Sequence, residues 1–381
     1  MISSLNIKNF KLHNDTSLQL RPLTVLTGMN GAGKSSVLQA MLLLRQSYMT
    51  HALETGLNLR GDLYDLGTAE DVECKGYTGD DDKVSFCMEF TDGAPLCFAF
   101  SLPKGRELEE TLLRNAQPLN IPIAKLQDYP LFNNAFQYMS AFRSGPQKSY
   151  SIDTYTVEVL RQISKNMGQC EYAVNFLYRF KRNKVGEISL CINDTGAEVA
   201  DISLQRQVEQ WMKRISPYTR ISISKEGDSL RLNYKFERIG NATTDEIKSM
   251  NTGFGITYVL PLLVGTLSAK KGSLLMIENP EAHLHPGGQA ALMELLCKAA
   301  AEGIQIVLET HSDHIINGAL VAVKKGILSK DDLAICFFER DETSHTAICH
   351  QLEILDDGRI SRPPKGFFDQ MDIDLNILTG F

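Results

Sequence analysis

The stretch Gly28-Met29-Asn30-Gly31-Ala32-Gly33-Lys34-Ser35 decides the fold of this chain of 381 residues. It matches G-x-x-x-x-G-K-[ST], a loop whose backbone N–H groups wrap nucleotide phosphates. The apolar run 23–27 predicts a buried strand before the loop, and the run 36–44 predicts a helix after it. Phosphate would then lie at a helix N-terminus, where unpaired N–H groups and the helix dipole favour anions. The residues expected to bind the nucleotide are Gly28, Asn30, Gly31, Ala32, Gly33, Lys34, Ser35 and Ser36.

Oxygen ligands for Mg²⁺ are expected from two parts of the sequence. Lys34 should reach the β- and γ-phosphates, and the Ser35 hydroxyl should bind the metal. Downstream, the apolar run 274–277 predicts a strand that ends in Glu278. Ligands of open α/β sheets bind at the carboxyl ends of strands, so Glu278 is the expected second Mg²⁺ ligand.

A second apolar run, 305–308, predicts another buried strand, and the polar residues after it include His311. We expect His311 to contact the γ-phosphate or the attacking water. Several histidines and an acid gather in this part of the chain, but their spacing matches no usual zinc site. These residues are His283, His285, His311, His314 and Glu281.

The segment 251–255, Asn-Thr-Gly-Phe-Gly, precedes an apolar run that predicts a helix as far as residue 268. Glycines before a helix let the backbone approach phosphate closely, so Thr252, Gly253 and Gly255 are further candidates for nucleotide contact. A simple helix-entry turn explains the two glycines equally well.

The composition is that of an ordinary globular protein, with 43% hydrophobic residues, 22% charged residues and a net charge of −7. This charge gives no overall attraction to nucleic acid or to anionic membranes, although it leaves room for a local basic patch. No run approaches the roughly 18 apolar residues of a membrane span. The first residues lack signal-peptide features and the cysteines lack C-x-x-C spacing, so we expect a cytoplasmic protein with reduced thiols. The cysteines are Cys74, Cys87, Cys97, Cys170, Cys191, Cys297, Cys336 and Cys349.

The order of predicted elements indicates an α/β fold in three sections. Residues 1–104 combine an antiparallel β-meander with the phosphate loop, and residues 105–245 form an inserted, mainly helical lid with a strand pair at its end. In residues 246–381 helices and strands alternate, as in a parallel sheet. The nucleotide site is therefore expected to be assembled from both ends of the chain.

Together these motifs resemble the ABC/SMC-type branch of P-loop ATPases. They are more similar still to prokaryotic AAA-family ATPases related to the overcoming-lysogenisation-defect (OLD) proteins. This resemblance implies an ABC-type P-loop NTPase head with a mixed sheet. The segments that carry it are the phosphate loop and residues 7–11, 251–255, 277–286 and 309–314, with a fainter match at 141–146 and a similar C-terminal extension at 364–370.

The resemblance implies a role for each motif. Glu278 takes the Walker B position, His311 takes that of the switch histidine, and Glu281 falls where the D-loop would be. The run 252–255 stands where the signature motif contacts the γ-phosphate bound by a partner subunit. ATP and Mg²⁺ would then be sandwiched between the heads of a homodimer or higher oligomer.

One residue departs from the pattern of these ATPases. The position after the Walker B acid usually holds a Glu that polarises water, and here it is Asn279. An amide can orient water but cannot accept its proton, and general-base help is typically worth about 10²–10⁴-fold. Turnover should therefore be slow unless Glu281, Glu309 or His311 substitutes. The expected catalytic set is Glu278, Asn279, Glu281 and His311.

By resemblance, we expect an ATPase that acts as a sensor or switch for a separate effector, a nuclease or toxin, in prokaryotic defence against phage or foreign DNA. Two alternatives are a nucleotide-loaded scaffold that does not hydrolyse ATP and an ATPase of DNA repair or processing. Cleavage by a Toprim nuclease domain within this chain is disfavoured because only about 40 residues follow Glu339.

Two basic clusters, 179–184 and 213–214, are candidates for DNA contact. Binding through them would weaken steeply with salt. A solvated helix face explains the same residues more simply.

Overall fold

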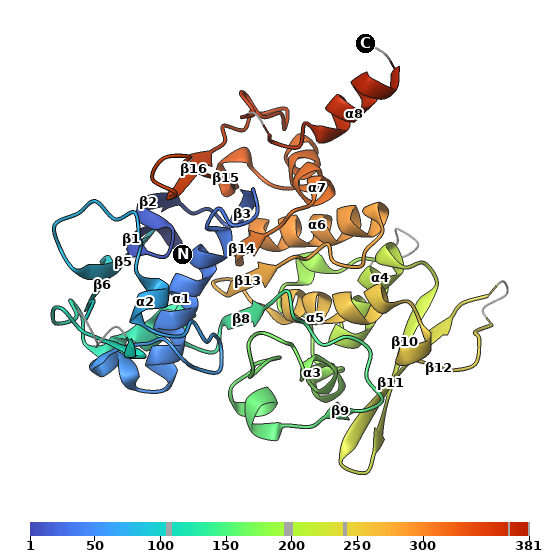
Figure 1. Ribbon diagram of the computed structural model, residues 1–381. Coiled ribbons are helices and arrows are strands. Elements are labelled where there is room, and N and C mark those ends of the chain that lie inside the picture. Colours follow the sequence, from blue (N-terminus) through green and yellow to red (C-terminus); the bar gives the residue numbers. More distant parts are fainter. Residues whose placement is uncertain (104–108, 194–200, 239–241, 365, 380–381) are drawn as a thin grey trace.

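The computed structural model describes residues 1–381 except 104–108, 194–200, 239–241, 365 and 380–381. A six-stranded sheet with the order β16-β15-β3-β14-β13-β8 forms its centre (Figure 1). All neighbouring strands in it are parallel except β15 and β16. The strands are β3 (Leu23–Gly28), β8 (Phe136–Met139), β13 (Leu274–Glu278), β14 (Gln305–Glu309), β15 (Leu333–Arg340) and β16 (Ala347–Gln351).

Both faces of this sheet are buried, which is why its strands are apolar runs rather than alternating ones. In β14, Ile306 and Leu308 join the core beneath the C-terminal helices, whereas Val307 joins the core beneath α1. Helices α5 and α6 pack on the first face, with α3, α4 and α7 packed against them in the same core, and α1 with the N-terminal sheet covers the second (Figure 1). The helices are α1 (Lys34–Met49), α3 (Ala173–Phe180), α4 (Leu204–Ile215), α5 (Phe254–Ser268), α6 (Pro286–Ala301) and α7 (Asp313–Lys324).

The N-terminal section contains the expected antiparallel sheet, with the strand order β2-β1-β5-β6. Smaller elements connect this sheet to the lid. They are the short helix α2 (Ala69–Val72) and the antiparallel strand pair β4 (Gly56–Asn58) and β7 (Leu112–Arg114). The four strands of the sheet are β1 (Ile2–Phe10), β2 (His13–Gln19), β5 (Lys83–Phe90) and β6 (Leu96–Ser101).

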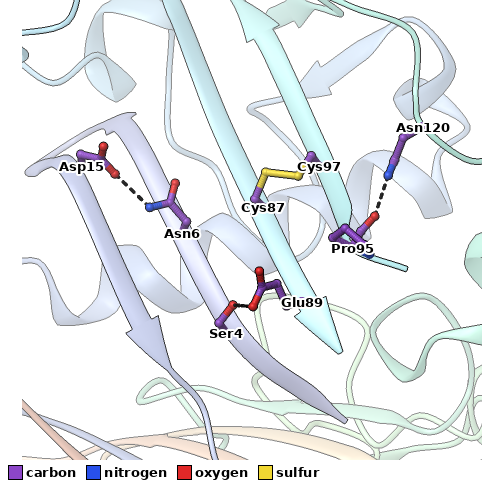
Figure 2. Close-up of a disulfide and its surroundings, with 8 residues drawn as sticks. All are labelled: Ser4, Asn6, Asp15, Cys87, Glu89, Pro95, Cys97 and Asn120. Carbon is purple, nitrogen blue, oxygen red and sulfur yellow. Dashed lines mark hydrogen bonds between the residues drawn. A yellow bond between two sulfur atoms is a disulfide. The ribbon is translucent and has the colours of Figure 1, made fainter. Parts of the chain in front are cut away.

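A disulfide joins Cys87 to Cys97 across the β5/β6 hairpin (Figure 2). The strand register places these two residues opposite each other, with their Cα atoms 4.1 Å apart. The expectation that every cysteine is a reduced thiol was therefore wrong for this pair. The separation of ten residues along the chain gives no signal until the hairpin brings the side chains together.

The middle section contains α3, α4 and a second antiparallel sheet, in which the expected strand pair is β10 (Thr219–Glu226) and β11 (Ser229–Phe236). The short strands β9 (Tyr150–Ser151) and β12 (Ile247–Lys248) each pair antiparallel with β11. The middle section also supplies β8 to the central sheet, in a region that the sequence predicts to be mostly helical. With only four residues, one of them the polar Gln137, β8 is too short for periodicity to identify as a strand. The expected boundary at 104/105 lies outside the described residues.

Just before its last helix, the C-terminal segment packs against the rest of the chain. Phe367 packs on Phe337 of β15, with ring centroids 5.6 Å apart, and Phe368 packs on Phe367. Helix α8 (Gln370–Thr379) then projects from the molecule (Figure 1). Among the described residues, no helix has both the length and the apolar character needed to cross a membrane.

Candidate functional site

The phosphate loop joins β3 to α1, as predicted, and its first glycine is fixed by β15. Gly28 has φ +124°, and a Cβ there would lie 2.1 Å from the carbonyl oxygen of Phe338. The Met29 N–H donates to the same carbonyl at 3.0 Å. Gly31, with φ +70°, faces open space. The loop is thus held at its start and open at its centre, where a phosphate would lie.

His13 of β2 holds the other end of the loop. Its Nε2 lies 3.1 Å from the Gly33 carbonyl oxygen, and its Nδ1 lies 3.0 Å from the Thr16 hydroxyl. Because a carbonyl can only accept, Nε2 carries the proton and Nδ1 accepts from Thr16. Burial lowers the pKa of His13 to about 4, so the ring is neutral at pH 7. Nothing in the sequence indicated this contact.

Lys34 and Ser35 begin α1 and face the ends of neighbouring strands. The Lys34 ammonium donates to the carbonyls of Gly28 at 2.9 Å and Met29 at 2.7 Å. The Ser35 hydroxyl donates to Oε1 of Glu309 at 2.9 Å. The second oxygen of Glu309, Oε2, is buried without a hydrogen-bond partner. Glu309 is therefore part of the site, although the sequence suggested it only as a substitute base.

Two acids lie side by side at this edge, because Glu278 and Glu309 end neighbouring parallel strands in the same register. Glu278 accepts hydrogen bonds from the Tyr138 hydroxyl at 2.9 Å and the Ala141 N–H at 3.0 Å. Burial raises the pKa of both carboxyls, that of Glu309 to about 7. Ser35 opposes the rise at Glu309 and the negative charge of Glu278 adds to it.

The donor set at this edge fits Mg²⁺, which prefers carboxylate and hydroxyl oxygens. Ser35 and Glu278 are the expected ligands, and Glu309 links them: it bonds to Ser35 and is the register neighbour of Glu278. The unpaired Oε2 of Glu309 is an acceptor that a metal-bound or attacking water would satisfy.

The loops after β13 and β14 contact each other. Asn279 has φ +43°, and its N–H donates to the Glu309 carbonyl at 2.9 Å. Both oxygens of Glu281 accept, one from the Thr310 hydroxyl at 2.8 Å and one from the His311 N–H at 2.9 Å. Burial lowers the pKa of His311 and the charge of Lys34 lowers it further, so the imidazole is neutral at pH 7. The fold thus brings the expected catalytic residues together, with Glu281 bracing the loop that carries His311.

Arg143 connects three of these segments and was missed from the sequence, although it lies in the faint match at 141–146. Its Nη1 donates to the carbonyls of Ser140 at 2.7 Å and Glu278 at 2.6 Å, and its Nη2 donates to the Asn279 carbonyl at 2.8 Å. The guanidinium also lies 4.6 Å from the centre of the Tyr258 ring on α5. Arg143 therefore fixes the end of β13 relative to β8 and α5.

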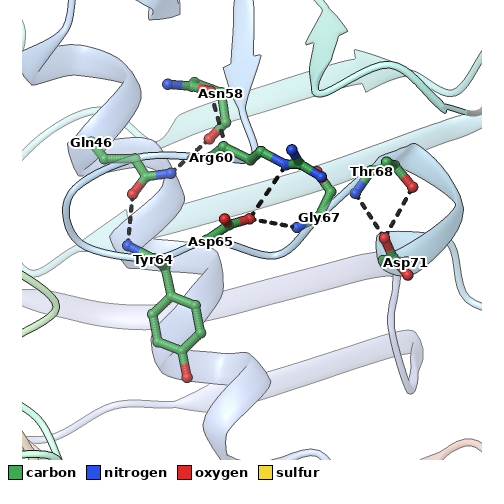
Figure 3. A network of polar contacts seen from close by, with 8 residues as sticks. All are labelled: Gln46, Asn58, Arg60, Tyr64, Asp65, Gly67, Thr68 and Asp71. Atoms are coloured by element: carbon green, nitrogen blue, oxygen red, sulfur yellow. Dashed lines mark hydrogen bonds and ion pairs between the residues drawn. The ribbon is translucent and has the colours of Figure 1, made fainter.

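Tyr64 is a further residue that the sequence did not indicate. Gln46 of α1 accepts from the Tyr64 N–H at 2.9 Å and donates to the Asn58 carbonyl at 2.8 Å, and Figure 3 shows this network. Burial raises the pKa of the Tyr64 phenol, and the charges of Glu278 and Glu309 raise it further. The phenol thus lies close enough to both carboxylates for their charges to affect its pKa.

The signature-like residues lie at the start of α5, where two glycines have opposite surroundings. A Cβ on Gly255 would lie 2.3 Å from the His283 carbonyl oxygen, whereas a Cβ on Gly253 would have nothing within 4 Å. The Thr252 hydroxyl donates to the Ser249 carbonyl at 2.8 Å. Within the described part of the chain, no hydrogen bond joins these three residues to the phosphate loop.

Three of the basic residues that were candidates for DNA contact form ion pairs with glutamates of the same chain. The pairs are Arg179–Glu158 at 2.7 Å, Lys213–Glu237 at 2.9 Å and Arg214–Glu294 at 2.7 Å. Glu339 of β15 forms a hydrogen bond with His350 on the neighbouring strand at 2.5 Å.

Sequence comparisons agree with this geometry. Residues 1–178 match a family described as "AAA ATPase domain", and residues 192–317 match "AAA domain, putative AbiEii toxin, Type IV TA system". Residues 328–378 match a protein of unknown function, DUF3696.

Three curated relatives extend the match. The OLD nuclease of Thermus scotoductus is 24% identical over 90% of this chain and 65% of its own length. The Old nuclease of Escherichia phage P2 is 22% identical over 83% of this chain and 57% of its own length. An ATP/GTP phosphatase of Helicobacter pylori is 25% identical over 38% of this chain and 46% of its own length. The chain thus spans less than two thirds of each of these relatives.

Among solved structures, an Smc head bound to the C-winged helix domain of ScpA superimposes with a TM-score of 0.54. It is 12% identical and covers 92% of this chain and 98% of its own. At that identity the likeness concerns the fold alone. The matched AAA domains and the OLD relatives, taken with the phosphate loop and the paired strand-end acids, support an OLD-like ATPase of the AAA/ABC type.

Proposed function

We propose that two copies of this chain close around ATP·Mg²⁺, hydrolyse it slowly, and thereby control a separate effector, a nuclease or toxin, in prokaryotic defence against phage or foreign DNA. The observation that carries the proposal is the meeting of Lys34, Ser35, Glu278 and Glu309 at one edge of the central sheet. The names of two relatives, OLD nuclease and Old nuclease, support the choice of a nuclease as effector.

In this proposal each residue of the edge has one task. The loop N–H groups and Lys34 bind the phosphates, and Ser35 and Glu278 hold Mg²⁺, which neutralises phosphate charge when bound. Glu309 takes the proton of the attacking water that Asn279 orients, because its Oε2 has no hydrogen-bond partner while its Oε1 accepts from Ser35.

His311 and Glu281 complete these assignments. His311, neutral at pH 7, donates a hydrogen bond to the γ-phosphate. Glu281 keeps the loop of His311 in place, because both its oxygens are already bonded to that loop.

Exposed apolar side chains around the edge support the pairing of two heads. Met29 of the phosphate loop is 62% exposed, Phe142 after β8 is 69% exposed, and Phe254 at the start of α5 is 46% exposed. Scattered exposed apolar residues are ordinary, but these three lie on the phosphate loop, just after β8 and at the start of the signature-like helix, three segments that a partner head would cover. A second head that covers them would bring its own signature-like segment to the bound nucleotide.

A scaffold that holds ATP without hydrolysing it is the second candidate, and Asn279 favours it. Phosphate release and light-scattering mass with ATP·Mg²⁺ separate the two. For the switch we expect a dimer that forms with ATP·Mg²⁺ and slow release that rises in Asn279→Glu, which restores the usual acid. ATP binding and pairing without release, in wild type and in Asn279→Glu, would establish the scaffold instead. A monomeric mass with bound ATP would refute the pairing.

A further inference from the structure

A cavity of about 820 Å³ lies at the edge of the central sheet opposite the nucleotide site. Its wall includes Ser273 and Leu275 at the start of β13, whereas Glu278 is at the end of that strand. It also includes Gly265 and Ser268 in the last turn of α5, whose first turn carries the signature-like glycines. Small-molecule sites usually measure about 300–1,000 Å³, so the cavity has the size of a ligand site.

Among the described residues, every charged side chain that lines the cavity is basic: Arg161, Lys184, Lys270 and Lys271. All four are exposed, and in the described part of the chain none of them forms an ion pair. The acid beside them, Glu187, accepts from the backbone N–H of Lys271 at 2.7 Å and is not part of the wall. The basic residues elsewhere on this lid are different, since Arg179, Lys213 and Arg214 are paired with glutamates. The cavity therefore concentrates positive charge that the chain itself does not neutralise.

Part of the cavity lining, which we call its floor, is apolar and aromatic. Phe176 and Phe180 of α3 contribute to it, and the Arg161 guanidinium lies 4.3 Å from the centre of the Phe180 ring. Asn134, Asn183 and Ser268 add amide and hydroxyl groups to the wall. A ligand with a planar ring and hydrogen-bonding edges fits such a floor. A ligand that carries more than one negative charge fits the cations that line the same cavity.

We propose that this cavity binds a nucleoside phosphate, with its base on the Phe176–Phe180 floor and its phosphate at Lys184, Lys270 and Lys271. The proposal gives a role to Lys184, the residue of the basic run 181–184 that lines the wall together with Asn183. A free nucleotide and the phosphorylated end of single-stranded nucleic acid both have this combination of a base and a phosphate. Helix α5 and strand β13 connect the cavity to the ATPase edge, so the ligand would be placed to influence the switch.

The test is direct binding to the full chain carrying Lys34→Ala, which removes phosphate-loop binding as a competitor. The probes are AMP, measured by calorimetry, and a 5′-phosphorylated thymidine hexamer, measured by fluorescence anisotropy. We expect saturable binding of at least one probe. Adding Lys184→Ala and Lys270→Ala to the chain should weaken the affinity about tenfold or more, because each substitution removes a charged hydrogen bond to the ligand. Lys225→Ala, an exposed lysine on β10 outside the cavity, is the matched control and should change nothing.

The two probes distinguish the sources of the ligand. Binding of AMP that depends on these lysines indicates a free nucleotide, and tighter binding of the hexamer that depends on them indicates a strand end. Absence of saturable binding of both probes, or an affinity that the double substitution leaves unchanged, overturns the proposal. Because Lys184 and Lys270 are exposed, the variants should melt at the temperature of their parent, and this is checked alongside. The readout is binding rather than ATP turnover, so it stands apart from the proposed ATPase cycle.

Discussion

The phosphate loop and the signature-like segment would contact the same nucleotide, yet they differ in how completely one chain surrounds them. Around the loop, Gly28 is fixed by Phe338, Gly33 by His13, and Ser35 by Glu309. At the signature-like segment, Gly253 is exposed with nothing near its Cβ position. One half of the site is thus completed within the chain, whereas the other presents a bare backbone to solvent.

This difference indicates which substitutions act within a chain and which act between chains. A change at the loop should affect nucleotide binding by a single copy. A change at Gly253 should leave the single copy intact and affect only what a second copy does.

Lys34→Ala should have the largest effect, because it removes the ammonium that the loop holds for the phosphates. We expect ATP-dependent phosphate release and ATP-dependent pairing to fall below detection, measured by phosphate assay and light scattering. Lys325→Ala, on the surface after α7, serves as the control and should behave as wild type. Residual turnover in Lys34→Ala that matches wild type would show that the loop is not the catalytic site.

Glu309→Gln should lower phosphate release by about 10²–10⁴-fold, the usual worth of a general base. ATP binding should persist, because the amide can still accept from Ser35. Glu281→Gln is the matched change at an acid whose oxygens are both bonded to the neighbouring loop, and it should have a smaller effect. Equal losses in the two variants would contradict the role that we assign to Glu309.

Gly253→Glu and Gly255→Ala test the open half of the site directly. Gly253 has φ −58° and free space around it, so Gly253→Glu should fold and bind ATP but lose pairing and turnover. Gly255→Ala places a Cβ against the His283 carbonyl and should lower the free energy of unfolding by about 1–3 kcal/mol. Normal pairing by Gly253→Glu would show that this segment does not face a partner.

His13 gives a pH-dependent prediction on the closed half. The unfolded chain binds a proton near pH 6.5, whereas the folded chain does so only near pH 4. The free energy of unfolding should therefore fall as the pH is lowered from 6.5 to 4, by roughly 3 kcal/mol from this residue. In His13→Gln, which does not titrate, denaturant unfolding should show a correspondingly weaker dependence on pH. Identical pH profiles would mean that His13 is not buried neutral beside Gly33.

The sequence predicts the parts of this site whose chemistry is local. The loop between β3 and α1, the acid that ends β13 and the alternation of helices with parallel strands can each be read from a short window. Residues that act by long-range contact could not be found in this way. Arg143 follows a four-residue strand in a region that the sequence predicts to be mostly helical, His13 lies in a hairpin far from the loop in sequence, and Cys97 pairs with Cys87 only through strand register.

Glu309 is an intermediate case. The run 305–308 indicates that a strand ends there, but an exposed terminal acid and a catalytic one look alike in sequence. Its hydrogen bond to Ser35 and its unpaired buried oxygen distinguish them, and both depend on the packing of β14 beside β3.

The most direct test of the central claim mixes two inactive chains, Lys34→Ala and Gly253→Glu. In a head-to-tail pair, the intact loop of one chain meets the intact signature-like segment of the other, so each mixed dimer contains one complete site. The account predicts that phosphate release, absent from either variant alone, returns on mixing to at most about half of the wild-type rate, because neither variant pairs with itself and each mixed dimer has one of two sites complete. Release that stays absent in the mixture, although both variants fold and Gly253→Glu binds ATP, would contradict a site shared between two chains.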